Sequence, residues 1–311
     1  MLKETAQTTS HILMVRPANF GFNEETAANN AFQTNDSTVS SAEVSRLALA
    51  EFDAFVDKLR SVGVDVIVME DTNRPLKPDA VFPNNWVTFH QNGTVVTYPM
   101  YAPVRRLERR DDIVRSIQER FRVEQKIQLQ EYEDIDQYLE GTGSMIIDRP
   151  NKLVYACLSP RTHLDLLVRY CKLMGYSAVP FHAVDGDGME IYHTNVMMAL
   201  GETFVVICLE TVQSEIEEEM LRKKFAATDK EIIPITLEQM MNFAGNMLQV
   251  RNAKGETFLV MSGQAFDSLT EAQVAQISKH TNILSSPIPT IETYGGGSAR
   301  CMMAEVFLPE K

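Results

Sequence analysis

The 311-residue sequence has few cysteines and no long uncharged apolar run. No stretch approaches the roughly 20 consecutive apolar residues of a membrane-spanning helix. The first residues, MLKETAQTTSHILMV, lack the basic segment and the apolar run of a secretory signal. The cysteines show none of the close spacings of a zinc site or a disulfide framework; they are Cys157, Cys171, Cys208 and Cys301. These absences favour a cytoplasmic protein without a membrane segment or a structural metal.

Positive charge is also scarce, because 29 Lys and Arg residues face 42 Asp and Glu residues for a net charge of −13. A surface of this sign repels the phosphate backbone, so the composition argues against a nucleic-acid partner. Most of the one basic cluster, at positions 105–110, is typical of a solvated helix start, since Asp111 and Asp112 follow it. The apolar fraction of 44% suits a globular protein, and we expect an enzyme that acts on a small molecule.

Turn signals recur between β-rich runs along the chain: QNGT at 91–94, RPNK at 149–152, LGET at 200–203 and NAKGE at 252–256. Each is typical of a hairpin connection. A helical pattern follows each second run, and these patterns begin near Leu107, Pro160, Ser214 and Leu269. A period of roughly fifty to sixty residues predicts a repeated strand-turn-strand-helix module.

Two of the predicted helices have clear ends. Ser40 and Glu43 have the spacing of a capping box, and Gly63 is typical of the residue that follows a helix. The helix predicted after Pro160 ends at Gly175 in the same way. Its expected apolar face consists of Leu164, Leu167, Val168 and Cys171.

The two ends of the chain each contain part of a module. The run HILMVRP at 11–17 and the terminal run SARCMMAEVFLP at 298–309 are strand-like and lack partners nearby. We predict that they pair and close a ring of five modules in a single domain over residues 1–311, with the active site in its centre. The polar segment at 18–39 is long for a connection and is a candidate lid.

Cys301 follows three glycines, in YGGGSARCMM. Gly295–Gly297 permit positive φ and a close approach of the backbone to a ligand, and Arg300 favours a thiolate. The ordinary alternative is a buried structural thiol, which we expect of the other three cysteines because they lie in apolar patterns. The glycine run therefore marks Cys301 as a candidate nucleophile.

A cysteine nucleophile needs a proton shuttle, and His193 is the strongest candidate among the six histidines. It interrupts an apolar strand pattern after the turn DGDG, although a core imidazole bonded to the backbone is the alternative. Glu140, in LEGTGS, and Asp79, in PDAVFPNNW, suit either a ligand site or an ordinary turn. No phosphate-binding or calcium-binding loop is complete, so we expect no metal and no organic cofactor.

Five motifs follow one another along nearly the whole chain: PDAVFPNNW, LEGTGSM, CLSPRT, YHTNVMM and GGGSARCM. With these five motifs in this order, the sequence resembles the amidinotransferase or pentein superfamily. That superfamily includes arginine deiminases, dimethylarginine dimethylaminohydrolases and glycine amidinotransferases. It is most similar to the citrulline-utilisation hydrolases within that superfamily. The resemblance implies an α/β fold, a five-bladed propeller with the site in its central channel. It also implies that Cys301 is the nucleophile, His193 the general acid and base, and Glu140 the carboxylate partner.

The resemblance extends to the residues that contact the substrate. Asp79, Asn84 and Asn85 match substrate-contact positions in the dimethylarginine hydrolases. Guanidine-binding relatives carry acidic residues at one or both of the positions held here by the two asparagines. Asn195 likewise stands where arginine deiminases carry an aspartate.

Two arginines match those that hold the α-carboxylate of the substrate in the dimethylarginine hydrolases. Arg161, in LSPRT, resembles its motif closely, and Arg105 is the second. Arg106 takes the place of Arg105 if the alignment shifts by one residue. The resemblance therefore implies an amino-acid substrate with a ureido or guanidino group.

The asparagines favour a neutral substrate. A carboxylate only accepts hydrogen bonds and suits a guanidinium, whereas an asparagine also donates and suits a ureido group with a carbonyl oxygen. The leading prediction is therefore hydrolysis of L-citrulline, or a close analogue, to ornithine, carbon dioxide and ammonia through a covalent cysteine intermediate.

Other interpretations stay open at this point. The first alternative is guanidine chemistry by an arginine deiminase, a dimethylargininase or an amidinotransferase. A ring that only binds an amino acid is the second, and a redox-sensing thiol on a structural protein is the third. A homodimer is compatible with each of them.

Overall fold

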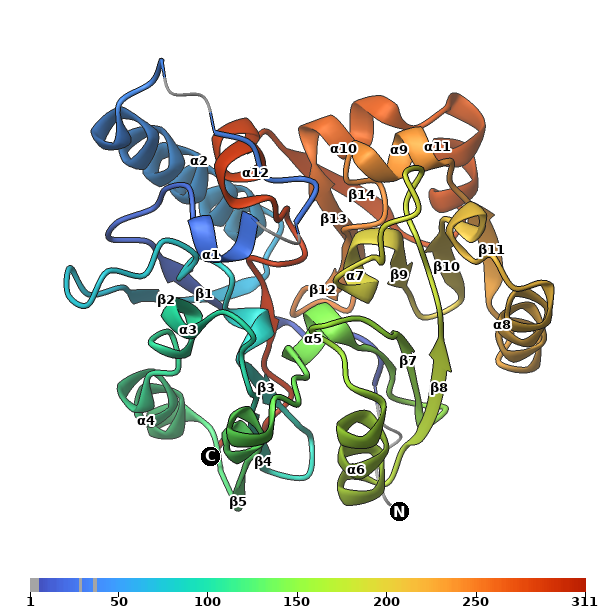
Figure 1. Ribbon diagram of the computed structural model, residues 1–311, viewed down its shortest axis with the longest axis horizontal. Coiled ribbons are helices and arrows are strands. Elements are labelled where there is room, and N and C mark those ends of the chain that lie inside the picture. The colour runs from blue at the N-terminus through green and yellow to red at the C-terminus, as the bar shows by residue number, and fades with distance from the viewer. Residues whose placement is uncertain (1–5, 28–29, 36–37) are drawn as a thin grey trace.

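The computed structural model describes residues 6–27, 30–35 and 38–311. In this part of the chain the strands form five three-stranded sheets, which are arranged around a common centre with the longer helices outside (Figure 1). The predicted α/β ring of five modules is therefore confirmed.

One pairing rule holds in every module: the middle strand is antiparallel to one neighbour and parallel to the other. The first complete module shows it. The strand β4 (Thr94–Thr97) pairs antiparallel with β3 (Val87–Phe89) and parallel with β5 (Gln125–Gln128). The helix α4 (Asp111–Arg120) connects the parallel strands, because such strands need a long crossover.

The next three modules repeat this order. The second contains β6 (Ile146–Asp148), β7 (Leu153–Cys157), α6 (Leu164–Met174) and β8 (Ser177–Phe181). The third contains β9 (Met198–Leu200), β10 (Phe204–Ile207), α8 (Glu215–Ala227) and β11 (Glu231–Pro234). The fourth contains β12 (Leu248–Arg251), β13 (Thr257–Ser262), α10 (Gly263–Ser268), α11 (Glu271–Ile277) and β14 (Asn282–Ser286).

The two ends of the chain form the fifth module. The strand β1 (His11–Arg16) is parallel to β2 (Asp65–Glu70), connected through α2 (Ser41–Ser61), and antiparallel to β15 (Ala304–Glu305). The predicted pairing of the ends is confirmed. The terminal strand is shorter than its apolar pattern suggests, because Cys301 lies in a turn that precedes it.

The predicted helix ends were mostly correct. Ser40 caps α2 by accepting from the Glu43 amide at 3.3 Å, and Gly63 (φ 84°) and Gly175 (φ 71°) follow α2 and α6 in the left-handed conformation. The helix expected near Leu107 begins instead at Asp111.

The predicted apolar face of α6 was wrong in part. Leu164 and Val168 are 41% and 51% exposed. The buried residues of this helix are Leu166, Leu167, Tyr170 and Cys171. Nearly every position from 164 to 168 is apolar, so the periodicity fitted two neighbouring faces equally well.

Short helical turns come just before the first strand of three modules and lie near the centre of the ring (Figure 1). They are the 3₁₀ turn η1 (Pro83–Asn85) before β3, α5 (Gly141–Ser144) before β6 and α7 (Thr194–Met197) before β9. The helix α5 packs against both η1 and α7. Similar turns precede β12 and β15, so each module directs a short segment toward the centre.

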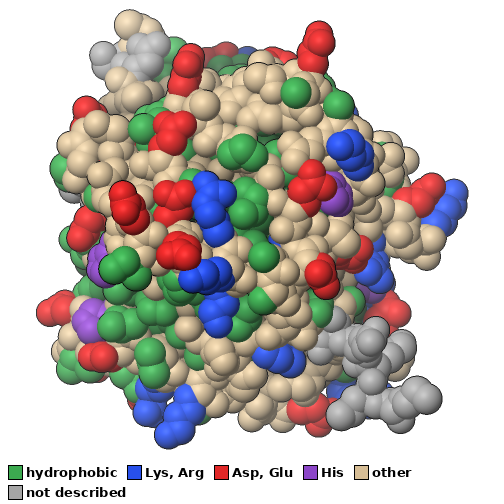
Figure 2. All heavy atoms as spheres, turned by 90° about the vertical axis from the view of Figure 1, so that its right-hand side faces the viewer, with side chains coloured by type: hydrophobic (Ala, Val, Ile, Leu, Met, Phe, Trp, Pro, Cys, Tyr) green, Lys and Arg blue, Asp and Glu red, His purple; other side chains and the backbone are tan. Residues whose placement is uncertain are grey.

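The surface carries both signs of charge. On the face seen in Figure 2, acidic and basic side chains are interspersed. The basic cluster at 105–110 is less solvated than we expected: Arg105 is 3% exposed, and Arg109 pairs with Glu133 at 2.5 Å. Over the described ranges, the helices are each too short or too polar to span a bilayer.

Candidate active site

Segments from all parts of the chain enclose a small cavity at the centre of the ring. The cavity is lined by Thr26, Asn30, Asp79, Phe82, Asn85, Arg105, Arg161, Tyr192, His193, Gly295, Gly296, Gly297 and Cys301. Its volume is about 20 Å³, which holds a single water molecule. The structure therefore brings most of the predicted site residues together in a closed site that must open to admit an amino acid.

Glu140 and His193 form the central hydrogen bond of the site. Glu140 precedes α5 and His193 precedes α7, and the contact between these helices holds His193 Nε2 2.7 Å from Glu140 Oε2. The other carboxylate oxygen accepts from the Tyr101 amide at 2.8 Å. Because the carboxylate fixes one ring nitrogen, the other nitrogen remains for proton transfer.

Burial and charge set the protonation of this pair. Burial alone would raise the pKa of Glu140, but Arg161 and the hydrogen bond to His193 outweigh it and lower that pKa to about 2. Burial lowers the pKa of His193 to about 4, although Glu140 opposes the shift. At neutral pH the site therefore contains a carboxylate and a neutral imidazole.

Arg161 lies beside this pair. Its Nη1 is 3.7 Å from Glu140 Oε2, and its guanidinium carbon is 4.8 Å from the centre of the Tyr192 ring. Its Nη2 donates to the Thr26 carbonyl at 3.2 Å. Arg161 thus contacts both the carboxylate of the site and the segment that covers it.

Cys301 lies in the turn before β15, and two side-chain amides point at its sulfur. Asn195 Nδ2 and Asn246 Nδ2 are each 3.3 Å from Cys301 Sγ. Both amides therefore hold the sulfur in place through N–H donors. The prediction that Arg300 interacts with the Cys301 sulfur is not supported, because the Arg300 guanidinium pairs with Glu305 at 2.7 Å.

The three glycines before Cys301 lie where neighbouring side chains leave no room for a Cβ atom. Gly296 ends α12 (Pro289–Gly295) with φ 60°. A Cβ on Gly295 or Gly297 would lie 2.8 or 2.9 Å from the Phe82 ring. The run therefore permits close packing around the cavity.

Asn85 directs a hydrogen-bond donor toward the histidine. Arg105 Nη1 donates to Asn85 Oδ1 at 3.0 Å, and because a guanidinium only donates, the amide oxygen must face it. The Asn85 Nδ2 group is then turned toward Gly143 and the His193 ring, and it is buried without a partner in the described chain. Such a donor suits an acceptor on a bound ligand.

Arg105 is more constrained than the sequence suggested. It forms a two-pronged ion pair with Glu108 at 2.9 Å and lies 3.6 Å from Asp79. Burial raises the pKa of Glu108 to about 7 although Arg105 opposes the shift, and burial also raises the pKa of Asp79. Arg106 lies outside the cavity lining and contacts Met100 and Glu133 instead.

Two predicted contact residues lie behind the cavity wall. Asn84 is fully buried and donates to Thr142 Oγ1 at 3.3 Å, outside the lining. Asn195 contacts the Cys301 sulfur from behind. Asp79 lines the cavity, and its Oδ2 accepts from Asn23 at 2.7 Å while its Oδ1 has no partner in the described residues.

The prediction missed Asn246, which the repeat itself places at the site. Asn246 comes two residues before β12, as Asn85 comes two residues before β3. Its amide also binds the Asn195 carbonyl at 2.9 Å and accepts from the Arg300 amide at 3.0 Å. Comparing equivalent positions of the modules would have identified it, although its motif FAGNM contains no titratable residue.

The segment at 18–39 covers the cavity where it is described. Asn30 Nδ2 donates to the Gly296 carbonyl at 3.3 Å, and Gln33 Nε2 donates to the Tyr294 carbonyl at 3.0 Å. Residues 28–29 and 36–37 of this predicted lid lie outside the described residues. No three His, Cys, Asp or Glu side chains in the described ranges are placed to bind a metal ion together.

The five-module ring defines the class of protein. It is the fold of the pentein or amidinotransferase superfamily, whose hydrolases cleave non-peptide C–N bonds. A family model, described as N,N dimethylarginine dimethylhydrolase, eukaryotic, matches residues 16–308. The chain therefore belongs to this family of guanidino-group hydrolases.

Solved structures support the fold. An arginine dihydrolase, ArgZ, from the ornithine-ammonia cycle in cyanobacteria superposes with a TM-score of 0.75 and 17% identity over 96% of this chain. The alignment covers only 41% of that protein, but 98% of its N-terminal domain with substrate bound, at a TM-score of 0.74 and 16% identity. A dimethylarginine dimethylaminohydrolase variant with an S-methyl-L-thiocitrulline adduct gives a TM-score of 0.62 and 15% identity, over 96% of this chain and 99% of that one. No curated protein gave a significant match.

Proposed function

We propose that Cys301 attacks the guanidino-type carbon of an arginine-derived amino acid and that the protein hydrolyses a C–N bond there. The observation that carries the proposal is the position of Cys301, His193 and two arginines around one cavity, with Glu140 hydrogen-bonded to His193 behind it. A thiol nucleophile, a proton shuttle and an orienting carboxylate are the groups that covalent hydrolysis of such a carbon requires.

In the first step the neutral imidazole of His193 takes the proton of Cys301, and the thiolate attacks the guanidino carbon. The tetrahedral species then expels an amine or ammonia, and His193 donates its proton to the departing nitrogen. The product is an amidino group bonded to sulfur. Water, deprotonated by the same histidine, attacks this group and restores the thiol.

Charged groups around the cavity suit the rest of an amino-acid substrate. Arg161 and Arg105 offer positive charge to the α-carboxylate. In the closed site they contact Glu140 and Glu108, so substrate binding must compete with these ion pairs. Asp79 Oδ1 has no partner among the described residues and is available to accept from a cationic group of the substrate.

The proteins of similar fold indicate which substrates to test first. The arginine dihydrolase ArgZ and a dimethylarginine dimethylaminohydrolase are among them, and a further structure of similar fold, a variant of AgrE, contains L-arginine. Arginine and N-methylated arginines are therefore the first candidates for this chain, with residues 1–311 acting as one catalytic unit.

L-Citrulline is the second candidate, and Asn85 favours it. Asn85 Nδ2 is a buried donor without a partner among the described residues and suits the ureido carbonyl oxygen. Asn195, which lies outside the cavity lining, supports the sulfur of Cys301 instead. Attack by Cys301 would release the ornithine amine and leave a carbamoyl thioester, which water converts to carbon dioxide and ammonia. This is the chemistry expected of a citrulline-utilisation hydrolase.

One substrate panel tests both candidates. The full chain is incubated separately with arginine, mono- and dimethylarginine, agmatine and citrulline, and ammonia, methylamines, citrulline and ornithine are quantified. Citrulline formed from an arginine supports the first candidate, and ornithine formed from citrulline supports the second. Cys301→Ala is expected to keep the fold and lose all turnover; turnover in that variant, or no product from any substrate, would reject the proposal.

A further inference from the structure

A groove opens on the surface beside the fourth module, between α9 (Leu237–Met241), α10 and α12. Its volume is about 770 Å³, large enough for a small organic molecule. Its lining combines carboxylates, amides and hydroxyls with a wall formed by Pro287, Ile288 and Pro289. Among the described residues that line it there is no Lys or Arg.

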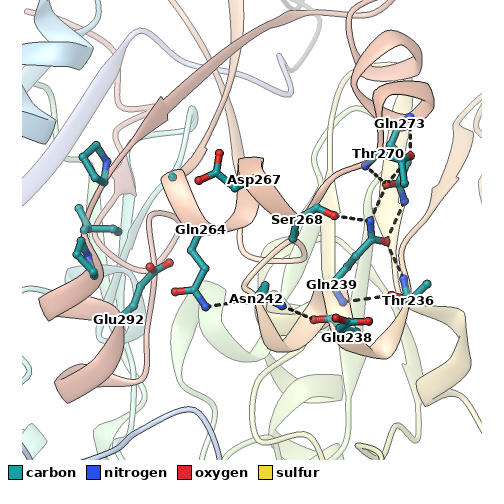
Figure 3. A pocket seen from close by; sticks show the side chains of 14 residues that line it. Thr236, Glu238, Gln239, Asn242, Gln264, Asp267, Ser268, Thr270, Gln273 and Glu292 are labelled. Atoms are coloured by element: carbon teal, nitrogen blue, oxygen red, sulfur yellow. Dashed lines mark hydrogen bonds between the residues drawn. The ribbon is translucent and has the colours of Figure 1, made fainter. Parts of the chain in front are cut away.

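Three carboxylates face this groove. Glu238 and Asp267 are exposed, and neither forms an ion pair within the described part of the chain. Glu292 is only 2% exposed and lies at the base of the groove. In Figure 3 its side chain points from α12 toward Gln264, and its Oε2 has no hydrogen-bond partner among the described residues. A buried acceptor without a partner is uncommon in proteins, and this one suits a hydrogen-bond donor on a ligand in the groove.

Glu292 is also connected to the nucleophile. Its Oε1 accepts from Ser298 Oγ at 2.6 Å, and the Ser298 carbonyl accepts from the Cys301 amide at 3.0 Å. The Glu292 carbonyl accepts from the Gly296 amide at 2.9 Å. The carboxylate at the base of the groove therefore holds the segment that presents Cys301.

We propose that the groove binds a linear organic dication without a carboxylate, such as a diamine, and that binding at Glu292 restrains the turn that carries Cys301. One ammonium group would pair with the exposed carboxylates Glu238 and Asp267, and the other with the buried carboxylate Glu292. The proline wall suits the methylene chain between the two ammonium groups. A carboxylate on the ligand would find no cation in the lining. A single metal ion does not fit, because the carboxylates are not placed to coordinate one ion together.

The surroundings of Glu292 make the ionisation of its carboxyl group sensitive to a cation in the groove. Burial raises its pKa to about 7, although the hydroxyls of Ser262 and Ser298 lower it, and Glu51 adds to the rise. A cation beside the carboxyl group therefore favours its ionised form. An ionised carboxylate accepts the Ser298 hydroxyl more strongly than a neutral one does.

Putrescine tests the binding step, because it has no carboxylate and no guanidino or ureido carbon. Isothermal titration calorimetry on the full chain is expected to show one site. The double variant Glu238→Gln/Asp267→Asn should raise the Kd at least about tenfold. Asp57→Asn/Glu119→Gln removes the same charge from exposed positions on α2 and α4 and should leave the Kd unchanged. Absence of binding, or equal weakening in both double variants, would overturn the proposal.

Alkylation of Cys301 by iodoacetamide, followed by peptide mass spectrometry, tests the connection. Saturating putrescine is expected to slow alkylation at least about twofold, and Glu292→Gln should abolish this effect. An unchanged rate in the wild-type protein, or an equal effect in Glu292→Gln, would contradict the proposal. Neither measurement uses a substrate, so the result is independent of the proposed hydrolysis.

Discussion

Asn246 Nδ2 lies 3.3 Å from Cys301 Sγ, and the same side chain accepts from the Arg300 amide through its Oδ1 at 3.0 Å. One side chain from the fourth module thus holds both the sulfur and the backbone of the fifth-module turn. The Asn195 amide approaches the same sulfur from the third module. The nucleophile is therefore fixed where three modules of the ring meet.

Replacement of Asn246 by Ala is expected to slow alkylation of Cys301 at pH 7 about tenfold, because a hydrogen bond to a charged group contributes about 1.5–3 kcal/mol. The Asn195 carbonyl and the Arg300 amide would also lose their partner, which lowers the free energy of unfolding by about 1–3 kcal/mol. Iodoacetamide kinetics and urea unfolding measure the two effects. Asn282→Ala, at an exposed position, is the control. A stability loss with unchanged alkylation would show that Asn246 is only structural.

The His193–Glu140 pair predicts how stability depends on pH. The pKa of His193 falls from an ordinary value of 6.5 to about 4 on folding, so between these values the unfolded chain binds a proton that the folded chain does not. The free energy of unfolding should therefore fall as pH drops from 6.5 to 4, by about 1.4 kcal/mol per pH unit from this group. Glu140, whose pKa is lowered to about 2, adds a further loss below its ordinary range near 4.5.

Urea unfolding at several pH values checks this slope. The variant His193→Gln lacks the titrating ring and should lose less stability than the wild type between pH 6.5 and 4. His182→Gln removes an exposed histidine, which pairs with Glu217 on the surface, and should keep the wild-type slope. Identical slopes in all three proteins would mean that folding does not lower the pKa of His193.

Asn85 is expected to decide between a neutral and a cationic substrate group. Asn85→Asp keeps an acceptor for Arg105 and replaces the unpartnered Nδ2 donor by a charged oxygen. A charge-assisted hydrogen bond of about 1.5–3 kcal/mol should then raise the ratio of kcat/KM for arginine over citrulline at least about tenfold. Asn84→Ala, at the neighbouring position outside the cavity lining, should leave this ratio unchanged. A ratio that falls in Asn85→Asp would mean that this amide does not face the reacting group.

Much of the ring could be predicted because its signals are local. Hairpin turns such as QNGT and caps such as Ser40 depend on a few adjacent residues, and both ends of the chain carry strand patterns. The buried face of α6 could not be predicted, since Leu164, Leu166, Leu167 and Val168 are all apolar and only the packing chooses among them.

The site was predictable where its chemistry is distinctive. Cys301, His193 and Glu140 stood out as reactive types in unusual settings. In the structure Cys301 and His193 line the same cavity, and Glu140 is hydrogen-bonded to His193. The pairing of Arg105 with Glu108 and the contact of Asn246 with the sulfur are tertiary relationships that no local pattern marks. The need for a glycine at position 143 was also not predictable, because the sequence does not show which side chains pack against Gly143.

Gly143 is expected to tolerate no side chain. A Cβ at this position would lie 2.3 Å from Asn85 Nδ2 and 2.8 Å from the His193 ring, so Gly143→Ala must displace both groups. Such overpacking costs about 1–3 kcal/mol of stability. The displaced imidazole would also lose its alignment with Cys301, and a misplacement of about 1 Å can lower the rate about a hundredfold. Thermal unfolding and turnover of the best substrate measure the two effects. Gly186→Ala is the matched control, because a Cβ there meets no atom within 4 Å and should change neither quantity. Full activity in Gly143→Ala would show that the imidazole can move without loss, and that its hydrogen bond to Glu140 does not set the rate.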